Sequence, residues 1–402
     1  MDRLSGPARI LHVEGNYDGT VGGSYFSLLF LLEHLDRSRF DSLLVLRRDT
    51  VLMPRFQAAA GAVRIIERTP PIRVPFRGTP VLGPAFGIVQ SVLNLMRFGA
   101  TIVRLSRVIK AERVRLVHLN NSVTSNHDWM LAAMLAGVPC ITHERGLNDE
   151  YSGMARWCAP RLARIICISQ AVFDKLIERG VARDNLVMIH NGLDPARVVP
   201  GRDQAAVRQA FGIGENRRII GMLGNIRAWK GQDVLARALP AIIERVPNLT
   251  CLFVGESTAR DREYDSQLRQ FIADHGLESH VVFTGYCQNV ADALSVMEVA
   301  VHASVLPEPF GRVLLEAMAA KRPVVGSRDG AVTEIVRDGE TGYTFAPGKS
   351  DELAARVIDL LERPEAGRAL GEAGYRRLLE HFHIAANVTK TMAVYSEVLD
   401  GA

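Results

Sequence analysis

The chain has 402 residues, of which 48% are hydrophobic and 23% are charged. This length exceeds what one hydrophobic core usually supports, so two globular domains are expected. The net charge of +4 is mild, yet fifteen Lys or Arg and five Asp or Glu lie between Asp36 and Arg115. Such a basic face suits anionic lipid or a phosphorylated acceptor, or is only a solvated surface. No nucleic-acid-reading motif accompanies it, so we expect no nucleic-acid partner.

The five cysteines are odd in number, widely spaced and free of any C-x-x-C pair. They argue against a disulfide framework and against a zinc site, and a reducing cytoplasm fits them best. The first residues lack the layout of a signal peptide. The longest uncharged stretch, residues 78–96, is broken by prolines and glycines, so no membrane span is expected there, and contact with a membrane surface stays open.

Short runs rich in Val, Ile and Leu alternate with longer amphipathic stretches, which is typical of buried parallel strands joined by crossover helices. The first series of predicted strands comprises residues 8–14, 42–48, 63–67, 115–121, 139–144, 164–169 and 185–191. A second series comprises residues 217–224, 249–255, 280–285, 299–304 and 322–327. The chain after Asp351 reads as helical to its last periodic segment, residues 385–399.

These series predict an α/β fold of two Rossmann-like parallel-sheet domains. Pro195, Pro200 and several glycines with little strand signal separate the two series. The predicted organisation is therefore an N-terminal domain at 1–195, a linker at 196–214, a second domain at 215–380, and a C-terminal helix at 381–402 that packs back on the first domain.

Glycines and amides follow the predicted strands of the first half. Gly22 and Gly23 belong to a glycine-rich loop between the first strand and an apolar helix, where a helix N-terminus makes a plausible cap over a diphosphate. Asn120, Asn121 and Ser122 end a strand, and we expect them to line the acceptor side. This edge is where open parallel sheets bind their ligands.

Cations follow the first strand of the second half. Arg227 and Lys230 lie after Gly224 and Asn225, where fixed positive charges can meet a pyrophosphate and stabilise a departing diphosphate. A helix entry at the surface is the alternative. Gly285 and Tyr286 follow a later strand, in a loop at the same edge of the predicted sheet.

The segment from Glu308 to Ala319 reads EPFGRVLLEAMA. Its two carboxylates, Glu308 and Glu316, suit a ligand rich in hydroxyl groups, because a carboxylate accepts two hydrogen bonds from a vicinal diol. The alternative is a structural role for both residues, with Glu308 as a loop carboxylate and Glu316 in a helix ion pair. Pro309 and Gly311 favour a helix start, at which free amides face an anion or sugar hydroxyls.

The complete string resembles the hallmark of the retaining GT-B glycosyltransferases often called family four, E-P-F-G-x-x-x-x-E-A-M-A. The resemblance implies that Glu316 holds the nucleotide ribose and Glu308 contacts the donor sugar. It places the acceptor side in the domain at 1–195 and the nucleotide sugar in the domain at 215–380, where the loop at Gly285 and Tyr286 is expected to contact the base of the donor. It also implies that amides around Phe310, Gly311 and Arg312 complete the cradle, and that Lys230 is the phosphate lysine. Glu334 matches a second glycine-rich turn, although a helix-start carboxylate without a ligand fits it equally well.

The resemblance further selects His143, at a strand end, as the histidine near the transferred sugar or the acceptor. It implies a retaining transfer of a hexose from a nucleotide-diphosphate sugar to a glycan, a lipid-linked or a small-molecule acceptor, with no other cofactor. No Asp-x-Asp occurs in the chain, so we expect no metal, with Lys230, Arg227 and helix amides neutralising the charge.

Two other functions stay open. A nucleotide-sugar epimerase of the same fold would release its product without an acceptor, and a non-catalytic nucleotide-sugar sensor would bind without reaction. Residues 81–110 mix apolar residues with Arg97, Arg104, Arg107 and Lys110, so they predict a membrane-surface helix or a helix that packs in the core. The protein is expected in the cytoplasm, with the inner face of the membrane as an alternative site.

Overall fold

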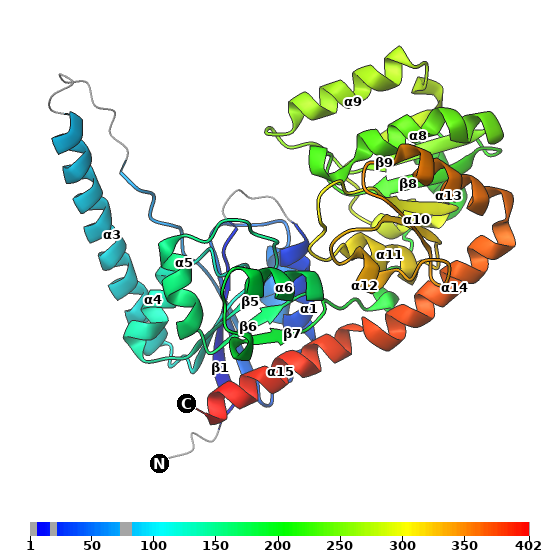
Figure 1. The fold of residues 1–402 in the computed structure, drawn as a ribbon. Helices are drawn as coiled ribbons and strands as arrows, with labels where there is room; N and C mark the ends of the chain where they lie inside the picture. Colours follow the sequence, from blue (N-terminus) through cyan, green and yellow to red (C-terminus); the bar gives the residue numbers. More distant parts are fainter. Residues whose placement is uncertain (1–5, 17–21, 73–82, 402) are drawn as a thin grey trace. The chain divides into compact units, whose positions relative to one another are not determined.

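The computed structural model describes residues 6–16, 22–72 and 83–401, without the side chains of residues 83–85. These residues form two compact units, each built on its own parallel sheet (Figure 1). The first unit is made of the described residues within Met1–Ile168, Val172–Ile189 and Asn387–Ala402. The second is made of Ser169–Ala171 and His190–Ala386. The predicted α/β class, with two parallel-sheet domains, is confirmed.

The first unit holds a seven-stranded sheet in the order β3-β2-β1-β4-β5-β6-β7. Every neighbouring pair is parallel, and each strand overlaps a predicted apolar run, although β2 and β3 begin one or two residues before theirs. The strands are β1 (Ala8–Glu14), β2 (Phe40–Leu46), β3 (Ala62–Ile65), β4 (Leu116–Leu119), β5 (Cys140–Glu144), β6 (Arg164–Cys167) and β7 (Leu186–Met188).

The helices of the first unit follow its strands, and the last of them comes from the far end of the sequence. They are α1 (Gly23–His34), α2 (Met53–Ala59), α3 (Gly83–Ala111), α4 (His127–Ala136), α5 (Gly153–Cys158), α6 (Gln170–Glu178) and α15 (Ile384–Asp400). Tyr395 of α15 is fully buried, with its ring against Phe40 and His118 of the first sheet. Residues 387–400 of α15 thus complete the core of the first unit.

The second unit holds a six-stranded sheet in the order β10-β9-β8-β11-β12-β13, again parallel throughout. Its strands are β8 (Arg218–Leu223), β9 (Leu249–Val254), β10 (Val281–Gly285), β11 (Val299–His302), β12 (Val324–Ser327) and β13 (Tyr343–Phe345). The last strand was not predicted from the sequence. It has three residues between Gly342 and Pro347, too few for a hydrophobic pattern.

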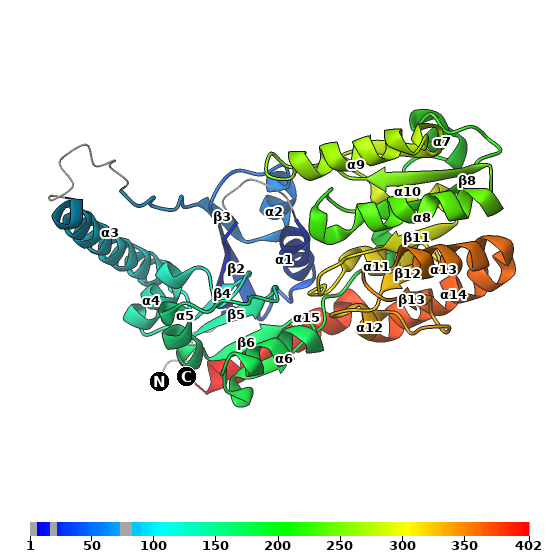
Figure 2. The ribbon, with the colours of Figure 1, turned by 45° about the horizontal axis from the view of Figure 1, so that its top comes forward.

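Helices cover both faces of the second sheet, as Figure 2 shows. They are α7 (Gln204–Ala210), α8 (Gln232–Arg245), α9 (Arg262–Asp274), α10 (Val290–Val296), α11 (Arg312–Ala319), α12 (Val332–Ile335), α13 (Ser350–Glu362) and α14 (Pro364–His381). Residues 196–214, expected as a linker, belong to this unit. There α7 packs on α10, and Asp292 of α10 accepts hydrogen bonds from the amides of Gly201 and Arg202.

Both sheets change direction at one internal strand pair. In the first sheet the strand order runs outward in both directions from β1 and β4, and in the second from β8 and β11. Loops leaving the carboxyl ends of such a pair diverge to opposite faces of the sheet, which opens a crevice for ligands. The two pairs therefore mark where each unit is expected to bind.

Candidate functional site

The second unit joins two predicted site residues at its switch point. Lys230 follows β8 in a short turn, and its Nζ donates to Oε2 of Glu308 at 2.7 Å. Glu308 lies in the loop after β11, and the same oxygen lies 3.0 Å from both His302 Nε2 and Ser304 Oγ. Only 17% of the Lys230 side chain and 8% of the Glu308 side chain are exposed. The result is a buried ion pair at the carboxyl edge of the sheet.

Glycines bring these loops within hydrogen-bonding distance. Gly231 has φ +73°, and a Cβ there would lie 2.1 Å from the carbonyl oxygen of Ala303. Gly330 has φ +56°, and a Cβ there would lie 2.4 Å from the carbonyl oxygen of Glu308. The amide of Ala331 donates to that same carbonyl at 2.9 Å. A side chain at either glycine would push apart the backbones that position Lys230 and Glu308.

Glu308 is held as a carboxylate. Burial would raise its pKa, but the charge of Lys230 and the hydrogen bond from His302 outweigh burial and hold the pKa well below its usual range. Lys230, His302 and Ser304, which contact Oε2 of Glu308, are each a cation or a hydrogen-bond donor. A fixed negative charge is thus present beside Lys230 before any ligand binds.

The other carboxylate of the motif has a different partner. Helix α11 begins at Arg312, directly after Gly311, which has φ +84°. Arg312 donates to Glu316 at 3.1 Å, one helical turn along, and both side chains are largely buried. Burial raises the pKa of Glu316, and the charge of Arg312 partly offsets this. A ligand hydroxyl at Glu316 must therefore share the carboxylate with Arg312.

The predicted residues Gly224, Asn225, Gly285 and Tyr286 lie in backbone turns at the ends of β8 and β10. Gly224 ends β8 with φ +136°, and Gly255 lies so close that a Cβ on it would be 2.3 Å from the Gly224 carbonyl oxygen. The amide of Gly255 donates to Gly285 at 3.0 Å, and Tyr286 next to it is 63% exposed. Asn225 uses its carbonyl to accept from the Gln232 side chain.

Arg227, Phe310 and Glu334 all make contacts within the unit. Arg227 Nε lies 3.4 Å from Asp261 Oδ2. Phe310 is buried against the rings of His190 and Phe382. Glu334 accepts from His190 and from the amides of Gln170 and Ala171 at the start of α6. These contacts favour the helix-start interpretation of Glu334, because they occupy both of its oxygens.

The predicted acceptor-side residues gather at the switch point of the first sheet. Asn120 and Asn121 donate to opposite oxygens of Glu14, each at 2.6 Å. Asn121 also accepts from the amide of Gly15, and Ser122 donates to Glu144 at 2.9 Å. Gly22 caps α1 and Gly23 is its first residue, a few positions after Gly15 in the sequence. Residues 17–21 of the glycine-rich loop lie outside the described residues.

His143, the predicted functional histidine, ends β5 inside a buried polar chain. Its Nδ1 lies 2.6 Å from Nε2 of His118, whose other nitrogen lies 2.6 Å from the Tyr395 hydroxyl. Burial holds the pKa values of His143 and His118 well below the usual range, and nearby Arg145 adds to the effect. His143 is therefore a neutral imidazole, suited to hydrogen bonding rather than to carrying charge.

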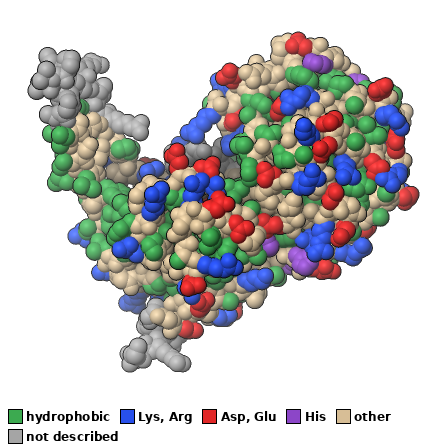
Figure 3. Space-filling model, in the orientation of Figure 1, with side chains coloured by type: hydrophobic (Ala, Val, Ile, Leu, Met, Phe, Trp, Pro, Cys, Tyr) green, Lys and Arg blue, Asp and Glu red, His purple; other side chains and the backbone are tan. Residues whose placement is uncertain are grey.

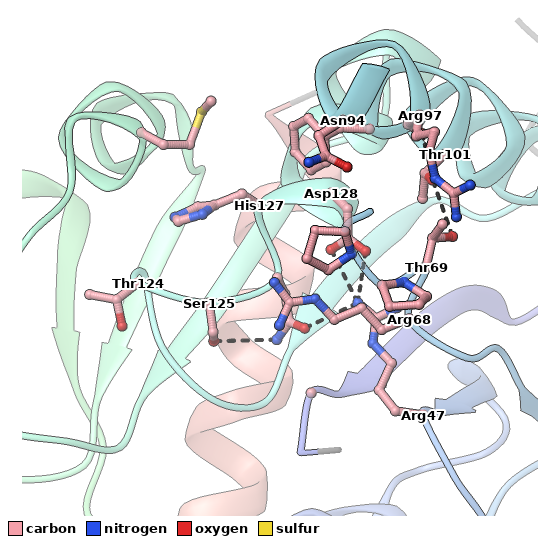
Figure 4. A pocket seen from close by; sticks show the side chains of 16 residues that line it. Arg47, Arg68, Thr69, Asn94, Arg97, Thr101, Thr124, Ser125, His127 and Asp128 are labelled. Carbon is pink, nitrogen blue, oxygen red and sulfur yellow. Dashed lines mark hydrogen bonds and ion pairs between the residues drawn. The ribbon is translucent and has the colours of Figure 1, made fainter. Parts of the chain in front are cut away.

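A pocket of about 460 Å³ opens in the first unit between α3, the segment before it and the start of α4 (Figure 4). Arg47, Arg68 and Arg97 line it, and Asp128 is the acidic residue among its walls. Asp128 forms an ion pair with Arg47 at 2.9 Å, and the lining as a whole carries three arginines and one carboxylate. Its walls therefore favour an anion.

Several residues that were not predicted from the sequence also lie at these edges. They are His302 and Ser304 beside Glu308, and Glu14, Glu144, Arg145 and Asn148 beside the acceptor-side amides. A usable signal existed, because Glu14, Glu144 and His302 are the last residues of apolar strands. Among the described residues, no group of three or more His, Cys, Asp or Glu is arranged to hold a metal ion.

Known proteins resemble the chain over both units. Residues 21–197 match the pattern of Glycosyltransferase Family 4, and residues 203–377 match that of Glycosyl transferases group 1. A glycogen synthase of Mycobacterium tuberculosis is 30% identical over 296 residues, which are 68% of this chain and 68% of the relative. The chain is a GT-B glycosyltransferase of family four. The resemblance first seen in the motif at Glu308 is thereby confirmed.

One further relative agrees with this family, and a solved structure shares the fold. A lipopolysaccharide core biosynthesis mannosyltransferase, LpsB of Rhizobium meliloti, is 26% identical over 357 residues, 87% of this glycosyltransferase and 97% of the relative. The crystal structure of Anabaena Alr3699/HepE, solved with UDP and glucose, superposes with a TM-score of 0.81 at 24% identity. The superposition covers 97% of this chain and 100% of the Alr3699/HepE chain. That likeness establishes the GT-B fold.

Proposed function

We propose that this glycosyltransferase moves a hexose, with retention at the anomeric carbon, from a nucleotide-diphosphate sugar to an acceptor bound by the first unit. The buried Lys230–Glu308 pair at the β8–β11 switch point carries the proposal. A lysine fixed at 2.7 Å from a carboxylate is positioned before the ligand arrives, so it needs no reorganisation to meet a diphosphate. Alr3699/HepE was solved with UDP and glucose, which makes UDP-glucose the first donor to test.

In this proposal each group of the second unit has one role. The Lys230 ammonium stabilises the negative charge that develops on the departing diphosphate, and Arg227 supports it from the same loop. Glu308 accepts hydrogen bonds from hydroxyls of the transferred sugar, while Glu316 holds the ribose in competition with Arg312. The amides at the start of α11 face the same edge of the sheet. This division of charge requires no metal ion.

We propose the pocket of the first unit as the site of an anionic acceptor. Arg68 and Arg97 supply its positive charge, and Ser125 and Thr101 supply hydroxyl groups. Asn120, Asn121 and Ser122 lie directly before Thr124 and Ser125, which line the pocket. The LpsB relative acts in lipopolysaccharide core biosynthesis, which agrees with an acceptor that carries negative charge.

A panel of nucleotide-diphosphate sugars tests the donor. A ligand that binds only the folded state at a hundred times its Kd stabilises that state by about 2.7 kcal/mol, so one member of the panel should raise Tm clearly. With that donor and a phosphorylated glycan or lipid acceptor, transfer should persist in EDTA, and NMR should show the anomeric configuration of the donor in the product.

Three results would overturn parts of the proposal. If no member of the panel raises Tm, the donor site is wrong. If EDTA abolishes transfer, the metal-independent charge balance is wrong, and an inverted product would exclude retention. Release of an altered sugar without any acceptor would favour the epimerase alternative.

A further inference from the structure

Helix α3 exposes apolar side chains on the side that faces away from the first unit. Side chains that are at least 45% exposed include Ile88, Val89, Val92, Leu93, Leu95 and Met96. Positions 88, 92, 95 and 96 recur at helical spacing, so these side chains form one continuous stripe. Figure 3 shows hydrophobic side chains along the outer edge of this helix. Monomeric soluble proteins rarely expose so continuous an apolar surface.

The polarity of α3 is inverted with respect to an ordinary surface helix. Its inward side carries Gln90, Asn94 and Thr101, and these bond to the extended segment that precedes the helix. The Asn94 side chain accepts from the amide of Ile72 at 2.7 Å and donates to its carbonyl at 3.1 Å. Polar side chains therefore hold the helix to the protein, while apolar ones face outward.

All the charges on α3 are positive. Residues 83–111 contain Arg97, Arg104, Arg107 and Lys110 and no Asp or Glu. The cations begin directly after the apolar stripe, which ends at Met96. An apolar segment followed by basic residues matches the charge order of an anionic bilayer, in which the hydrocarbon lies beneath negatively charged headgroups.

The part of α3 that does not pack on the first unit is too short to span a membrane, so it favours docking on the membrane surface. Phe86–Ala111 is long and apolar enough to cross a membrane by length and composition alone. However, Leu105 and Ile109 are buried, and α3 packs on α4, so the second half of α3 belongs to the folded unit. Residues 86–96 remain, and eleven helical residues extend about 16 Å, roughly half of a hydrocarbon core of about 30 Å.

We propose that α3 is a membrane-docking helix whose outer face, residues 88–96, enters one leaflet of an anionic bilayer. Arg97 and Arg104 then lie at the level of the lipid headgroups. The inner face of the same helix lines the pocket assigned above to the acceptor, with Asn94, Arg97 and Thr101 in its wall (Figure 4). Docking therefore holds the mouth of this pocket at the membrane surface. The docking itself depends only on the first unit and not on the proposed reaction.

Vesicle co-sedimentation tests this proposal with the full chain. We expect binding to vesicles of phosphatidylcholine mixed with phosphatidylglycerol, and much weaker binding to phosphatidylcholine alone. The double variant Val92→Glu with Met96→Glu should lower the partition coefficient by at least about tenfold, because each glutamate must leave water on insertion. A matched control, Val199→Glu with Leu379→Glu, replaces two exposed apolar residues of the second unit and should bind as the parent does.

A second variant distinguishes a loss of membrane binding from a loss of folding. Arg97→Gln leaves the apolar stripe intact and should weaken binding to anionic vesicles about fivefold, the effect of about 1 kcal/mol per cation near such a surface. Equal binding of the parent and the Val92→Glu/Met96→Glu variant would overturn the proposal, provided that both unfold at the same temperature. Absence of binding to either vesicle, with self-association of the parent that the double variant loses, would show instead that a second copy covers α3.

Discussion

Lys230 and Glu308 form the ion pair on which the proposed donor site depends. Such a pair is stabilising only while both partners are present, because removal of one leaves the other charged group buried without compensation. When Lys230 is replaced, His302 and Ser304 remain as hydrogen-bond partners of Glu308. The pair is therefore sensitive to single substitutions and tolerant of a matched double substitution.

We expect Lys230→Ala to lower the free energy of unfolding by about 1 to 3 kcal/mol, the usual cost of leaving a buried partner unpaired. Adding Glu308→Gln should recover much of that loss. Lys321→Ala is the control, because Lys321 pairs with Glu372 on the surface of the same unit, where such pairs contribute about 0 to 1 kcal/mol. Urea unfolding measures all three. An equal effect of Lys230→Ala and Lys321→Ala would contradict the burial of the Lys230–Glu308 pair.

Glu144 is a second buried carboxyl, and it titrates near neutrality. Burial raises its pKa to about 7, although Val123, Ser122 and Asn148 donate to it. Between about pH 4.5 and pH 7 the folded protein keeps this proton and the unfolded chain has lost it, so stability falls as pH rises through this window. The buried histidines act in the opposite sense, since an unfolded histidine gains a proton below its usual pKa of about 6.5.

The comparison of wild type with Glu144→Gln separates the two effects. The difference in unfolding free energy, wild type minus variant, should fall by roughly 3 kcal/mol between pH 4.5 and pH 7 and stay constant above that. Urea unfolding at intervals across this range measures it. A difference that does not change with pH would show that Glu144 is ionised in the folded protein throughout.

At the scale of elements, the loops that follow β8 and β11 owe their close contact to glycine. Gly231 and Gly212 both have positive φ, +73° and +68°, but only at Gly231 would a Cβ meet a neighbouring backbone atom. Gly212→Ala should therefore cost only the conformational strain of about 1 to 2 kcal/mol. Gly231→Ala should cost clearly more, and should weaken donor binding because Lys230 is displaced.

Equilibrium unfolding of these two glycine variants, with Tm measured in the presence of donor, checks this prediction. Equal stability losses would show that the Ala303 carbonyl moves aside without cost. In that case the close approach of the two loops would not be what positions Lys230.

Strands and strand-end residues could be predicted because parallel strands are buried on both faces and appear as apolar runs. The motif at Glu308 predicted one half of the proposed donor site, and Lys230 predicted the other. The partners of these residues could not be predicted in the same way. His302 and Ser304 reach Glu308 only through turn geometry, which depends on φ values at Gly231 and Gly330. The Arg312–Glu316 pair is an exception, because its i,i+4 spacing can be seen in the sequence and a helix ion pair was one of the two interpretations of the motif. The short strand β13 was missed for want of a pattern.

At the scale of the whole molecule, two units use the same plan. Each has a parallel sheet whose order reverses at one strand pair, and each gathers its polar residues at the carboxyl ends of that pair. The second unit provides a fixed cation and two carboxylates, and the first provides a pocket with positive charge. A glycosyltransferase needs both a donor site and an acceptor site, and we propose that each unit provides one of them.

The most direct test of the account is calorimetric titration of the donor identified from the panel into the parent protein, Lys230→Ala, Glu316→Gln and the control Lys321→Ala. We predict that the first two variants bind at least about tenfold more weakly, the effect of losing about 1.4 kcal/mol, and that the control binds as the parent does. Unchanged affinity in both Lys230→Ala and Glu316→Gln would contradict the assignment of the donor to the β8–β11 edge of the second sheet.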